Sequence, residues 1–560
     1  MYGCGLCILS KSFSVQRLSA LLVRASTIVS SKLYLKLPSP LYTELCLQTW
    51  KELISVCYAT ASTACPSTSV CLLLPRPAPA EVIAARKFEV IITDSDAIDN
   101  VPALDVARKL GDAIGAEVQC WPDCPDGETQ YVGRTDKVTV HSQSSVCLGG
   151  TFDQLHNGHR VLLSVAALLA QRRLLVGVTD ASMLQRKVLA PLIQAYDERC
   201  QVVADFLRDI NCTTEAPVTF ARLTDPFGPP ISDPDFTCII ASPESLSSCQ
   251  KINQRRSEKD FPPLHIEEIQ FTKGEVWGSA EGLHCPSDWP EEKISSSTYR
   301  LQLLGRLLRS PRPQAASGHD SRRRPYVIGL AGPAGSGKSS ICRHLSDFGG
   351  ERLSLLPADQ IAHGIYEPGT RAYHALIENF APDVIICSEP PHRIDRKKLG
   401  GIVFSSPDKL RTLNGVVWPE IAQSLKEEIT RIQSLTPASA PLPVVVIDAA
   451  LLFDAGWDKL CDEVWVSYVP RDACERRLAE RQKISLEEAK SRLISQSAGV
   501  KSTVGDDRVD WWTPCQRGSN TGPIAQSNVV FCTEWEVPFT RSQVERAWQS
   551  LLTRIDRSSS

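Results

Sequence analysis

Two loops, each between an apolar run and a helix-like run, constrain the fold of this chain most strongly. Residues 149–159 read GGTFDQLHNGH, and residues 332–339 read GPAGSGKS. The glycines let the backbone approach a phosphate, and a helix N-terminus with free amide groups favours an anion. The strand–loop–helix order around both loops predicts an α/β protein with two doubly wound parallel-sheet domains.

Length and composition narrow the class of protein. A chain of 560 residues predicts about two to four domains. Its net charge of −3 offers no general attraction to nucleic acid, so we expect no such partner. We also expect no transmembrane segment, because no apolar stretch reaches the ~18 residues that a span needs. The 20 cysteines lack a repeated CxxC pair at zinc-like spacing, which favours buried, reduced thiols. Protein partners stay open.

The first 43 residues differ from the rest. No Asp or Glu precedes Glu44, while Lys11, Arg17 and Arg24 are spread among Ser and Leu. This composition is typical of a mitochondrial transit segment. A disordered leader without a targeting function explains it equally well. Localisation in the mitochondrion, the cytoplasm or both follows, and residues 44–142 form a less defined N-terminal region without a catalytic signature.

Apolar runs and polar breaks divide the remainder. Residues 143–309 predict a first domain, 310–325 a polar linker and 326–560 a second domain. Thr540 and Gln543 stand at capping-box spacing and predict the start of the last helix. Lys501–Ala525 has neither helical nor strand periodicity, so we interpret it as an insertion. Strands are predicted at residues 88–93, 145–148, 174–178, 326–331, 444–447, 464–469 and 528–532.

The first loop carries two histidines at a helix start. His156 and His159 can meet nucleotide phosphates together with the free backbone amides. Imidazole donors stabilise the charge that grows on an α-phosphate under attack, without a covalent intermediate. A second segment, residues 294–300, reads ISSSTYR, and its hydroxyls and arginine suit the β- and γ-phosphates.

This pair of segments resembles the nucleotidyltransferase superfamily of HxGH and ISSTxxR proteins. The DPFGP turn at residues 225–229, and Lys187 ahead of YDER at residues 196–199, are similar to eukaryotic-type phosphopantetheine adenylyltransferase. Lys251 and Arg255 are candidates for the acceptor side, although solvated charge explains them better. The resemblance implies catalytic roles for His156, His159 and Arg300. It implies ATP-binding roles for Gly149, Gly150, Thr151, Lys187, Ser295, Ser296 and Ser297.

The second loop matches the P-loop pattern G-x-x-x-x-G-K-[ST]. Its amide groups cradle phosphates, Lys338 reaches the β- and γ-phosphates, and Ser339 binds Mg²⁺. Asp359, twenty residues after Ser339, could deprotonate an acceptor hydroxyl, or it could be a loop cap. The expected ATP-binding residues are Gly332, Pro333, Ala334, Gly335, Ser336, Gly337, Lys338 and Ser339.

The residues after the P-loop resemble dephospho-CoA kinase. The match rests on DRKKLG at residues 395–400, on Trp418-Pro419 and on the stretch from Asp448 to Trp457. It implies that Asp359 is the base, that His363 and Arg396 contact the acceptor and that Arg481 is the lid arginine. Asp448 would hold Mg²⁺ through water, and a simple strand-end aspartate is nearly as good an interpretation.

Together the two halves resemble the bifunctional coenzyme A synthases. The resemblance implies that 4′-phosphopantetheine and ATP give dephospho-CoA, which a second ATP phosphorylates at its ribose 3′-hydroxyl, with Mg²⁺ in both steps. Two alternatives stay open: another pairing, such as a nicotinamide-nucleotide or cytidylyl transferase with a nucleoside kinase, and a metabolite-binding scaffold whose kinase half no longer turns over.

Overall fold

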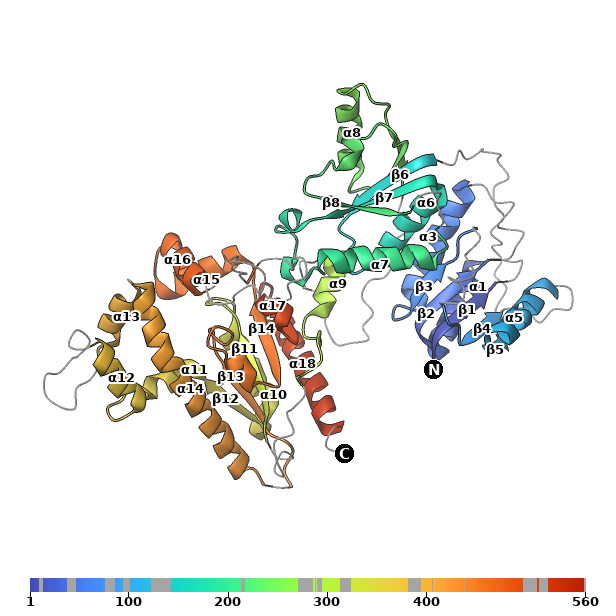
Figure 1. Cartoon of the computed structure of the whole chain (residues 1–560). Helices are drawn as coiled ribbons and strands as arrows, with labels where there is room; N and C mark the ends of the chain where they lie inside the picture. Colours follow the sequence, from blue (N-terminus) through green and yellow to red (C-terminus); the bar gives the residue numbers. More distant parts are fainter. Residues whose placement is uncertain are drawn as a thin grey trace. The chain divides into compact units, whose positions relative to one another are not determined.

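The computed structural model contains three parallel sheets of five strands each, divided between two compact units (Figure 1). Unit 1 comprises Met1–Gly278, Pro290–Arg300 and Gln516–Gly518, and unit 2 comprises Ser279–Trp289, Leu301–Cys515 and Ser519–Ser560. No helix in the described part of the chain combines the length and apolarity that crossing a membrane requires. The described residues are 1–9, 14–37, 47–75, 86–93, 101–121, 143–212, 217–269, 286–287, 289, 295–312, 324–380, 394–404, 406–437, 439–496, 511–512 and 522–557.

The first sheet of unit 1 is built from the N-terminal region that the sequence left undefined. Its strand order is β3-β2-β1-β4-β5, with β1 in the centre. Its elements are β1 (Tyr2–Ile8), α1 (Val15–Ile28), β2 (Val29–Lys36), α3 (Leu47–Ala64), β3 (Ser69–Leu72), β4 (Val90–Thr93), α5 (Val101–Ile114) and β5 (Glu117–Cys120).

The segment predicted as a leader is part of this sheet. Strand β1 pairs with β2 and β4, and the helix between β1 and β2 buries Leu18, Leu21 and Leu22 in the core. Residues 1–43 therefore include two of five strands, and a cleavage near residue 43 would remove the central one. Arg17, one of the cations that suggested a transit segment, is buried on α1. Whether this segment also directs import stays a prediction.

The second sheet of unit 1 carries the histidine loop. Its strand order is β10-β9-β6-β7-β8, and the loop follows the central strand β6. Its elements are β6 (Gln143–Gly150), α6 (Asn157–Leu169), β7 (Ala170–Thr179), α7 (Tyr196–Asp209), β8 (Thr219–Leu223), β9 (Cys238–Ala241), α8 (Leu246–Ser257), β10 (His265–Glu268) and α9 (Ser296–Leu303), with 3₁₀ turns η2 (Ala181–Met183), η3 (Ala190–Leu192) and η4 (Pro229–Ile231).

The two sheets of unit 1 share one hydrophobic core, in which α3 packs against α6. Arg86 reinforces this core by donating to the carbonyl of Asp209 at 2.9 Å and to the amide oxygen of Asn211. Lys32 and Tyr34 both bind the carboxylate of Asp209, each at 2.6 Å. The N-terminal sheet is therefore an integral part of unit 1.

The sheet of unit 2 has the order β12-β13-β11-β14-β15, and the P-loop follows its central strand. Helices α11 to α13 all pack against the long helix α14 (Figure 1). The elements are β11 (Tyr326–Ala331), α10 (Lys338–Gly349), η7 (Gly350–Arg352), β12 (Leu353–Pro357), α11 (Ala358–Gly364), α12 (Arg371–Phe380), α13 (Arg396–Phe404), α14 (Pro407–Leu435), β13 (Val444–Asp448), η8 (Trp457–Leu460), β14 (Glu463–Tyr468), α15 (Arg471–Gln482), α16 (Leu486–Gln496), α17 (Pro523–Gln526), β15 (Val529–Cys532) and α18 (Val537–Arg557).

The structure bears on two sequence expectations in unit 2. The capping box is wrong, because α18 begins at Val537 and Gln543 instead pairs through its amide with both backbone groups of Cys532. In the predicted insertion, Trp512 donates to the carbonyl of Val469 at 2.8 Å, and the helix α17 packs on β14. Both described parts of residues 501–525 therefore pack on unit 2, and the rest lies outside the described residues.

Candidate active sites

The histidine loop turns sharply between β6 and α6. Phe152 and Gln154 have φ angles of 52° and 47°, in the left-handed region that non-glycine residues rarely adopt. Phe152 is buried, and its ring lies against Gly150, where a Cβ would approach it to 3.1 Å. His156 is the N-cap residue of α6 and makes no side-chain cap bond. Backbone strain of this kind clusters at functional sites because the surrounding structure holds it in place.

The two histidines form a stack that leaves polar atoms unused. The rings of His156 and His159 lie 3.8 Å apart at 24°, and Tyr299 of α9 stacks on His156 at 5.8 Å and 7°. The Nδ1 atoms of both histidines are buried and have no hydrogen-bond partner among the described residues. An orphaned buried nitrogen is costly unless a ligand satisfies it. The stack is thus suited to binding a polar ligand.

Burial keeps both imidazoles neutral. Desolvation is the main cause that lowers the pKa of His159 to about 3, and Lys187 adds to the effect. Burial, followed by His159, Arg160 and Arg300, lowers the pKa of His156 well below its usual value. A neutral imidazole has one N–H group that can donate a hydrogen bond. The pair can therefore act as hydrogen-bond donors to phosphate.

This neutrality predicts a pH dependence of stability. Because the folded protein holds His159 neutral down to a pKa of about 3, the unfolded chain takes up the proton first as the pH falls below 6.5. Unit 1 should therefore lose about 2 kcal/mol of unfolding free energy between pH 8 and pH 5 through this residue. Denaturant unfolding of wild type and His159→Gln measures it: the variant should lose less stability on acidification. Equal losses would contradict the burial effect, and His265→Gln, an exposed histidine on β10, is the control.

Arg300 joins the two motifs of unit 1. It pairs with Asp153 of the histidine loop at 2.5 Å, and the two side chains are 1% and 0% exposed. Its other nitrogens donate to the carbonyl of Val188 at 2.8 Å and to the hydroxyl of Ser297 at 2.9 Å. The sequence predicted Arg300 as a triphosphate ligand and missed Asp153. The structure gives Arg300 a positioning role, and its contact with phosphate stays a prediction.

A second buried arginine, Arg199, was quoted in the YDER stretch but given no role. It is 1% exposed and donates to the carbonyls of Thr151, Thr179 and Gln194 at 2.7 to 2.9 Å. It thereby fixes the ends of β6 and β7 beside the histidine loop. Its position on the buried face of α7, in line with Val203 and Phe206, was the signal that the sequence offered.

The remaining predicted ATP ligands of unit 1 differ in their surroundings. Ser295 caps α9, because its hydroxyl accepts from the amide of Thr298 at 3.3 Å. Ser296 begins α9 and is partly buried. Lys187 has a pKa that burial and Arg300 lower, while Asp153 raises it. Gly149, Gly150 and Thr151 lie at the end of β6, so the predicted set gathers around one edge of this sheet.

The predicted acceptor candidates of unit 1, Lys251 and Arg255, lie on α8 beside a loop that arginines hold. Asp225 accepts from the amides of Phe227 and Gly228 at 2.8 and 3.0 Å, and Arg255 lies over the ring of Phe227 at 4.0 Å. Arg256, which the sequence analysis missed, is 0% exposed. It donates to five carbonyls, those of Pro230, Asp233, Pro234, Phe236 and Pro262. Lys251 is exposed on α8.

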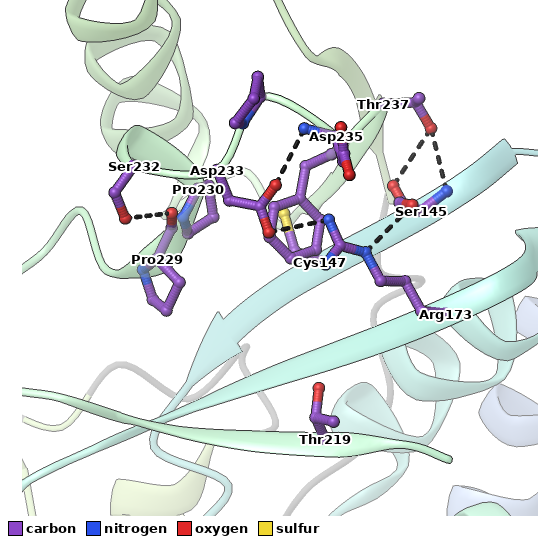
Figure 2. Close-up of polar contacts among 12 residues, drawn as sticks. Ser145, Cys147, Arg173, Thr219, Pro229, Pro230, Ser232, Asp233, Asp235 and Thr237 are labelled. Carbon is purple, nitrogen blue, oxygen red and sulfur yellow. Dashed lines mark hydrogen bonds and ion pairs between the residues drawn. The ribbon is translucent and has the colours of Figure 1, made fainter. Parts of the chain in front are cut away.

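Figure 2 shows a further tether of the same loop. Arg173 of β7 pairs with Asp233 at 2.9 Å and donates to the hydroxyl of Ser145 at 3.2 Å. Thr237 closes the network by donating to the carbonyl of Ser145 at 3.1 Å. The loop is thus fixed from α8 and from the sheet, which leaves Arg255 and Phe227 at a defined position.

The P-loop of unit 2 requires its glycines. Gly332 and Gly337 have φ angles of 153° and 90°, and a Cβ on Gly337 would lie 2.6 Å from the hydroxyl of Thr533. The carbonyl of Ser336 accepts from Ser467 at 2.5 Å and from Thr533 at 2.8 Å. Residues 332–337 link β11 to α10, and Lys338 and Ser339 begin that helix.

Thr533 is in turn held by a residue that the sequence analysis missed. Arg477 of α15 donates to the hydroxyl of Thr533 at 2.9 Å and to its carbonyl at 2.6 Å. The predicted lid arginine, Arg481, is exposed on the last turn of the same helix. Arg477 therefore links the P-loop to α15, while a role for Arg481 stays a prediction.

Two carboxylates lie near the ammonium of Lys338. Asp448 ends β13, and Pro357, which pairs with Asp448 in register, immediately precedes the helix that carries Asp359. Burial lowers the pKa of Lys338, whereas Asp448 and Asp359 raise it. Burial also raises the pKa of Asp448, and Asp359 adds to that rise. Lys338 donates to the carbonyl of Gly332 at 2.7 Å.

These groups fit a magnesium ion held mainly by phosphate and water. The donors are hard oxygens, the carboxylate of Asp448 and the exposed hydroxyl of Ser339, and Mg²⁺ commonly uses one or two protein carboxylates beside substrate phosphates. Within the described ranges, no group of three or more His, Cys, Asp or Glu residues forms a metal cage. The set therefore suits Mg²⁺ that arrives with ATP.

The predicted acceptor residues of unit 2 come together. Arg396 donates to the backbone carbonyl of His363 at 3.1 Å and lies over the ring of Tyr366 at 5.2 Å. Arg396 and His363 are both exposed. The contact runs through the backbone of His363 and does not use its imidazole. Tyr366 was not predicted and adds an aromatic face to this surface.

The fold and sites define an α/β protein with a nucleotidyltransferase-like sheet and a P-loop kinase sheet. The cytidylyltransferase-like family matches residues 147–302, and the dephospho-CoA kinase family matches residues 326–510, a range that reaches into the predicted insertion. The chain belongs to the dephospho-CoA kinase family through this second part.

Individual relatives agree with both matches. Dephospho-CoA kinases from Carboxydothermus hydrogenoformans and Symbiobacterium thermophilum are 39% and 32% identical over 170 and 225 residues, which cover 30% and 40% of this chain and 77% and 80% of theirs. Phosphopantetheine adenylyltransferase from Saccharomyces cerevisiae is 35% identical over 163 residues, 30% of this chain and 48% of the yeast protein. The chain thus spans about half of that adenylyltransferase.

Proposed function

We propose that this chain catalyses the last two steps of coenzyme A synthesis, adenylyl transfer in unit 1 and phosphoryl transfer in unit 2. The observation that carries the proposal is the stacked, neutral histidine pair with orphaned Nδ1 atoms, in a chain that belongs to the dephospho-CoA kinase family. Neither site alone would identify the metabolite on which the chain acts. Their pairing makes the product of one the acceptor of the other.

In the first step, a phosphate oxygen of 4′-phosphopantetheine attacks the α-phosphorus of ATP. The bond from that phosphorus to the bridging oxygen breaks, and diphosphate leaves. His156 and His159 donate hydrogen bonds to the phosphate oxygens as charge grows on them, and Lys187 supplies a cation near the same loop. Asp153, Arg199 and Arg300 hold the loop in place. No enzyme nucleophile is needed, because the substrate supplies one.

In the second step, the ribose 3′-oxygen of dephospho-CoA attacks the γ-phosphorus of a second ATP, and ADP leaves. Asp359 accepts the hydroxyl proton, and Lys338 stabilises the transferred charge. Ser339 and, through water, Asp448 would hold Mg²⁺, which would supply positive charge against the ATP phosphates. His363 and Arg396 contact the acceptor, and Arg481 closes over the phosphates. These roles are supported by the family membership of residues 326–510.

Substrate profiling of the full chain tests the proposal against other enzyme pairings. With ATP and Mg²⁺, 4′-phosphopantetheine should be the preferred adenylyl acceptor over nicotinamide mononucleotide, and dephospho-CoA the preferred phosphoryl acceptor over free nucleosides. Preference for nicotinamide mononucleotide or a nucleoside would favour another enzyme pairing. Nucleotide binding without turnover of any acceptor would favour a scaffold.

We also propose a mitochondrial or cytoplasmic localisation, on the basis of the acid-poor first 43 residues. Fractionation of cells that make the chain with a C-terminal tag tests it, and mass measurement of the recovered chain reports whether residues 1–43 are retained. Recovery in the secreted fraction would exclude both locations.

A further inference from the structure

The N-terminal sheet has the same architecture as the adenylyl-transfer sheet. Both have the strand order third, second, first, fourth, fifth within their own set of five. In each set, one helix joins the first strand to the second, one joins the second to the third, and one joins the fourth to the fifth. These helices are α1, α3 and α5 in the N-terminal sheet and α6, α7 and α8 in the other. The element order and the sheet order thus agree between the two sets of five strands, so the N-terminal sheet has the same topology as the adenylyl-transfer sheet.

The N-terminal sheet lacks the groups that the proposed chemistry uses. Residues 1–140 contain no histidine, and the stretch between β1 and α1, residues 9–14, contains no glycine. In the other sheet, the equivalent stretch holds His156 and follows Gly149 and Gly150. Adenylyl transfer by the mechanism of the second sheet therefore has no counterpart in the first.

What the N-terminal sheet does contact is the histidine turn itself. Asn157 follows His156 in the chain. Its side-chain amide nitrogen Nδ2 donates to the hydroxyl of Ser62 at 2.7 Å and to the carbonyl of Tyr58 at 3.2 Å. Both acceptors belong to α3 of the N-terminal sheet. A neighbouring bond runs from Arg160 to the carbonyl of Val70 at 2.8 Å.

This contact fixes the first turn of α6. Asn157 is the first residue of that helix, directly between the N-cap His156 and the inner part of the turn. Its two hydrogen bonds to α3 tie this turn, which carries both stacked imidazoles, to the N-terminal sheet. A displacement of about 1 Å at a reacting group can cost about 100-fold in rate, so a bond that holds this turn bears on turnover.

We infer that the N-terminal sheet is a catalytically silent copy of the nucleotidyltransferase fold, and that its helix α3 positions the histidine turn through Ser62 and Asn157. This inference rests on the proposed adenylyl transfer. It makes Ser62, Tyr58 and Asn157 positioning residues, since none of them touches the reacting atoms. The N-terminal region thereby acquires a role in the first step and none in the second.

Ser62→Ala tests the inference in the full chain. It should lower kcat for dephospho-CoA formation about threefold to tenfold, the usual effect of one lost hydrogen bond, with little change in the KM for ATP. Asn157→Ala, which removes both bonds, should lower it further, and the double variant should be no slower than Asn157→Ala alone. Thr63→Ala is the matched control, because Thr63 is exposed and its hydroxyl donates to the carbonyl of Thr60 in the same helix.

The phosphorylation of added dephospho-CoA serves as the internal reference. It should stay unchanged in every variant. If Ser62→Ala also lowers the unfolding temperature, Ser62→Thr, which keeps the hydroxyl, should restore turnover. Equal kcat in Ser62→Ala, Thr63→Ala and wild type would overturn the inference, as would additive losses in the double variant or failure of Ser62→Thr to restore turnover. A wild-type chain that makes no dephospho-CoA would instead refute the proposed function.

Discussion

Lys338→Ala should make dephospho-CoA accumulate from 4′-phosphopantetheine and ATP, with CoA formation reduced roughly 100- to 1000-fold. The ammonium of Lys338 lies beside Asp448 and Asp359 at the carboxyl edge of the sheet. Its removal takes away the cation that stabilises the transferred phosphoryl group and leaves two carboxylates to repel the triphosphate. Unit 1 contains the separate histidine loop, so the rate of dephospho-CoA formation should stay at the wild-type value. Mass spectrometry of the products over time measures both rates at once.

Lys426→Ala is the control for this variant, because that lysine is exposed on α14, away from the P-loop. It should convert 4′-phosphopantetheine to CoA as wild type does. If Lys338→Ala instead stops dephospho-CoA formation while the chain remains folded, the two sites are not independent.

His159→Ala should give the reverse pattern. Dephospho-CoA formation should fall by roughly 100- to 1000-fold, because one preorganised donor to the α-phosphate is lost. The stack with His156, at 3.8 Å between ring centres, is lost too. Phosphorylation of added dephospho-CoA should continue at the wild-type rate. The measurement is the initial rate of diphosphate release with 4′-phosphopantetheine, and of ADP release with dephospho-CoA.

His265→Ala is a suitable comparison, since His265 lies on β10 with an exposed side chain that contacts Glu267. It should leave both rates near those of wild type. A folded His159→Ala protein that has lost both activities would refute two separate sites. One that keeps full adenylyl transfer would remove the histidine pair from the mechanism.

The sequence predicted the elements around both loops well because local signals specify them. The run 326–331 is a fully buried strand with the predicted bounds. Within the N-terminal sheet, β4 was predicted by the run 88–93, whereas β3 and β5 were missed because they have only four residues each and carry no motif. The acid-poor composition of its first helix suggested a leader. The sequence could not show that Arg17 is buried, because that burial depends on contacts with residues distant in the chain.

The site residues follow the same division. Motif residues such as His156 and Lys338 were found because their neighbours in sequence identify them. Asp153, Arg199, Arg256 and Arg477 were missed as positioning residues because their partners are distant in the chain or are backbone carbonyls. Arg477, for example, acts on the P-loop through Thr533, which follows a different strand. Such contacts arise from packing and leave no periodic signal in the sequence.

The most direct test of the central claim is a time course with the purified full chain, 4′-phosphopantetheine, excess ATP and Mg²⁺, followed by mass spectrometry. We expect dephospho-CoA to form first with one diphosphate released per molecule, and CoA to follow with one ADP per molecule. A chain that converts 4′-phosphopantetheine to neither product would contradict the assignment of unit 1. One that stops at dephospho-CoA would contradict the assignment of unit 2.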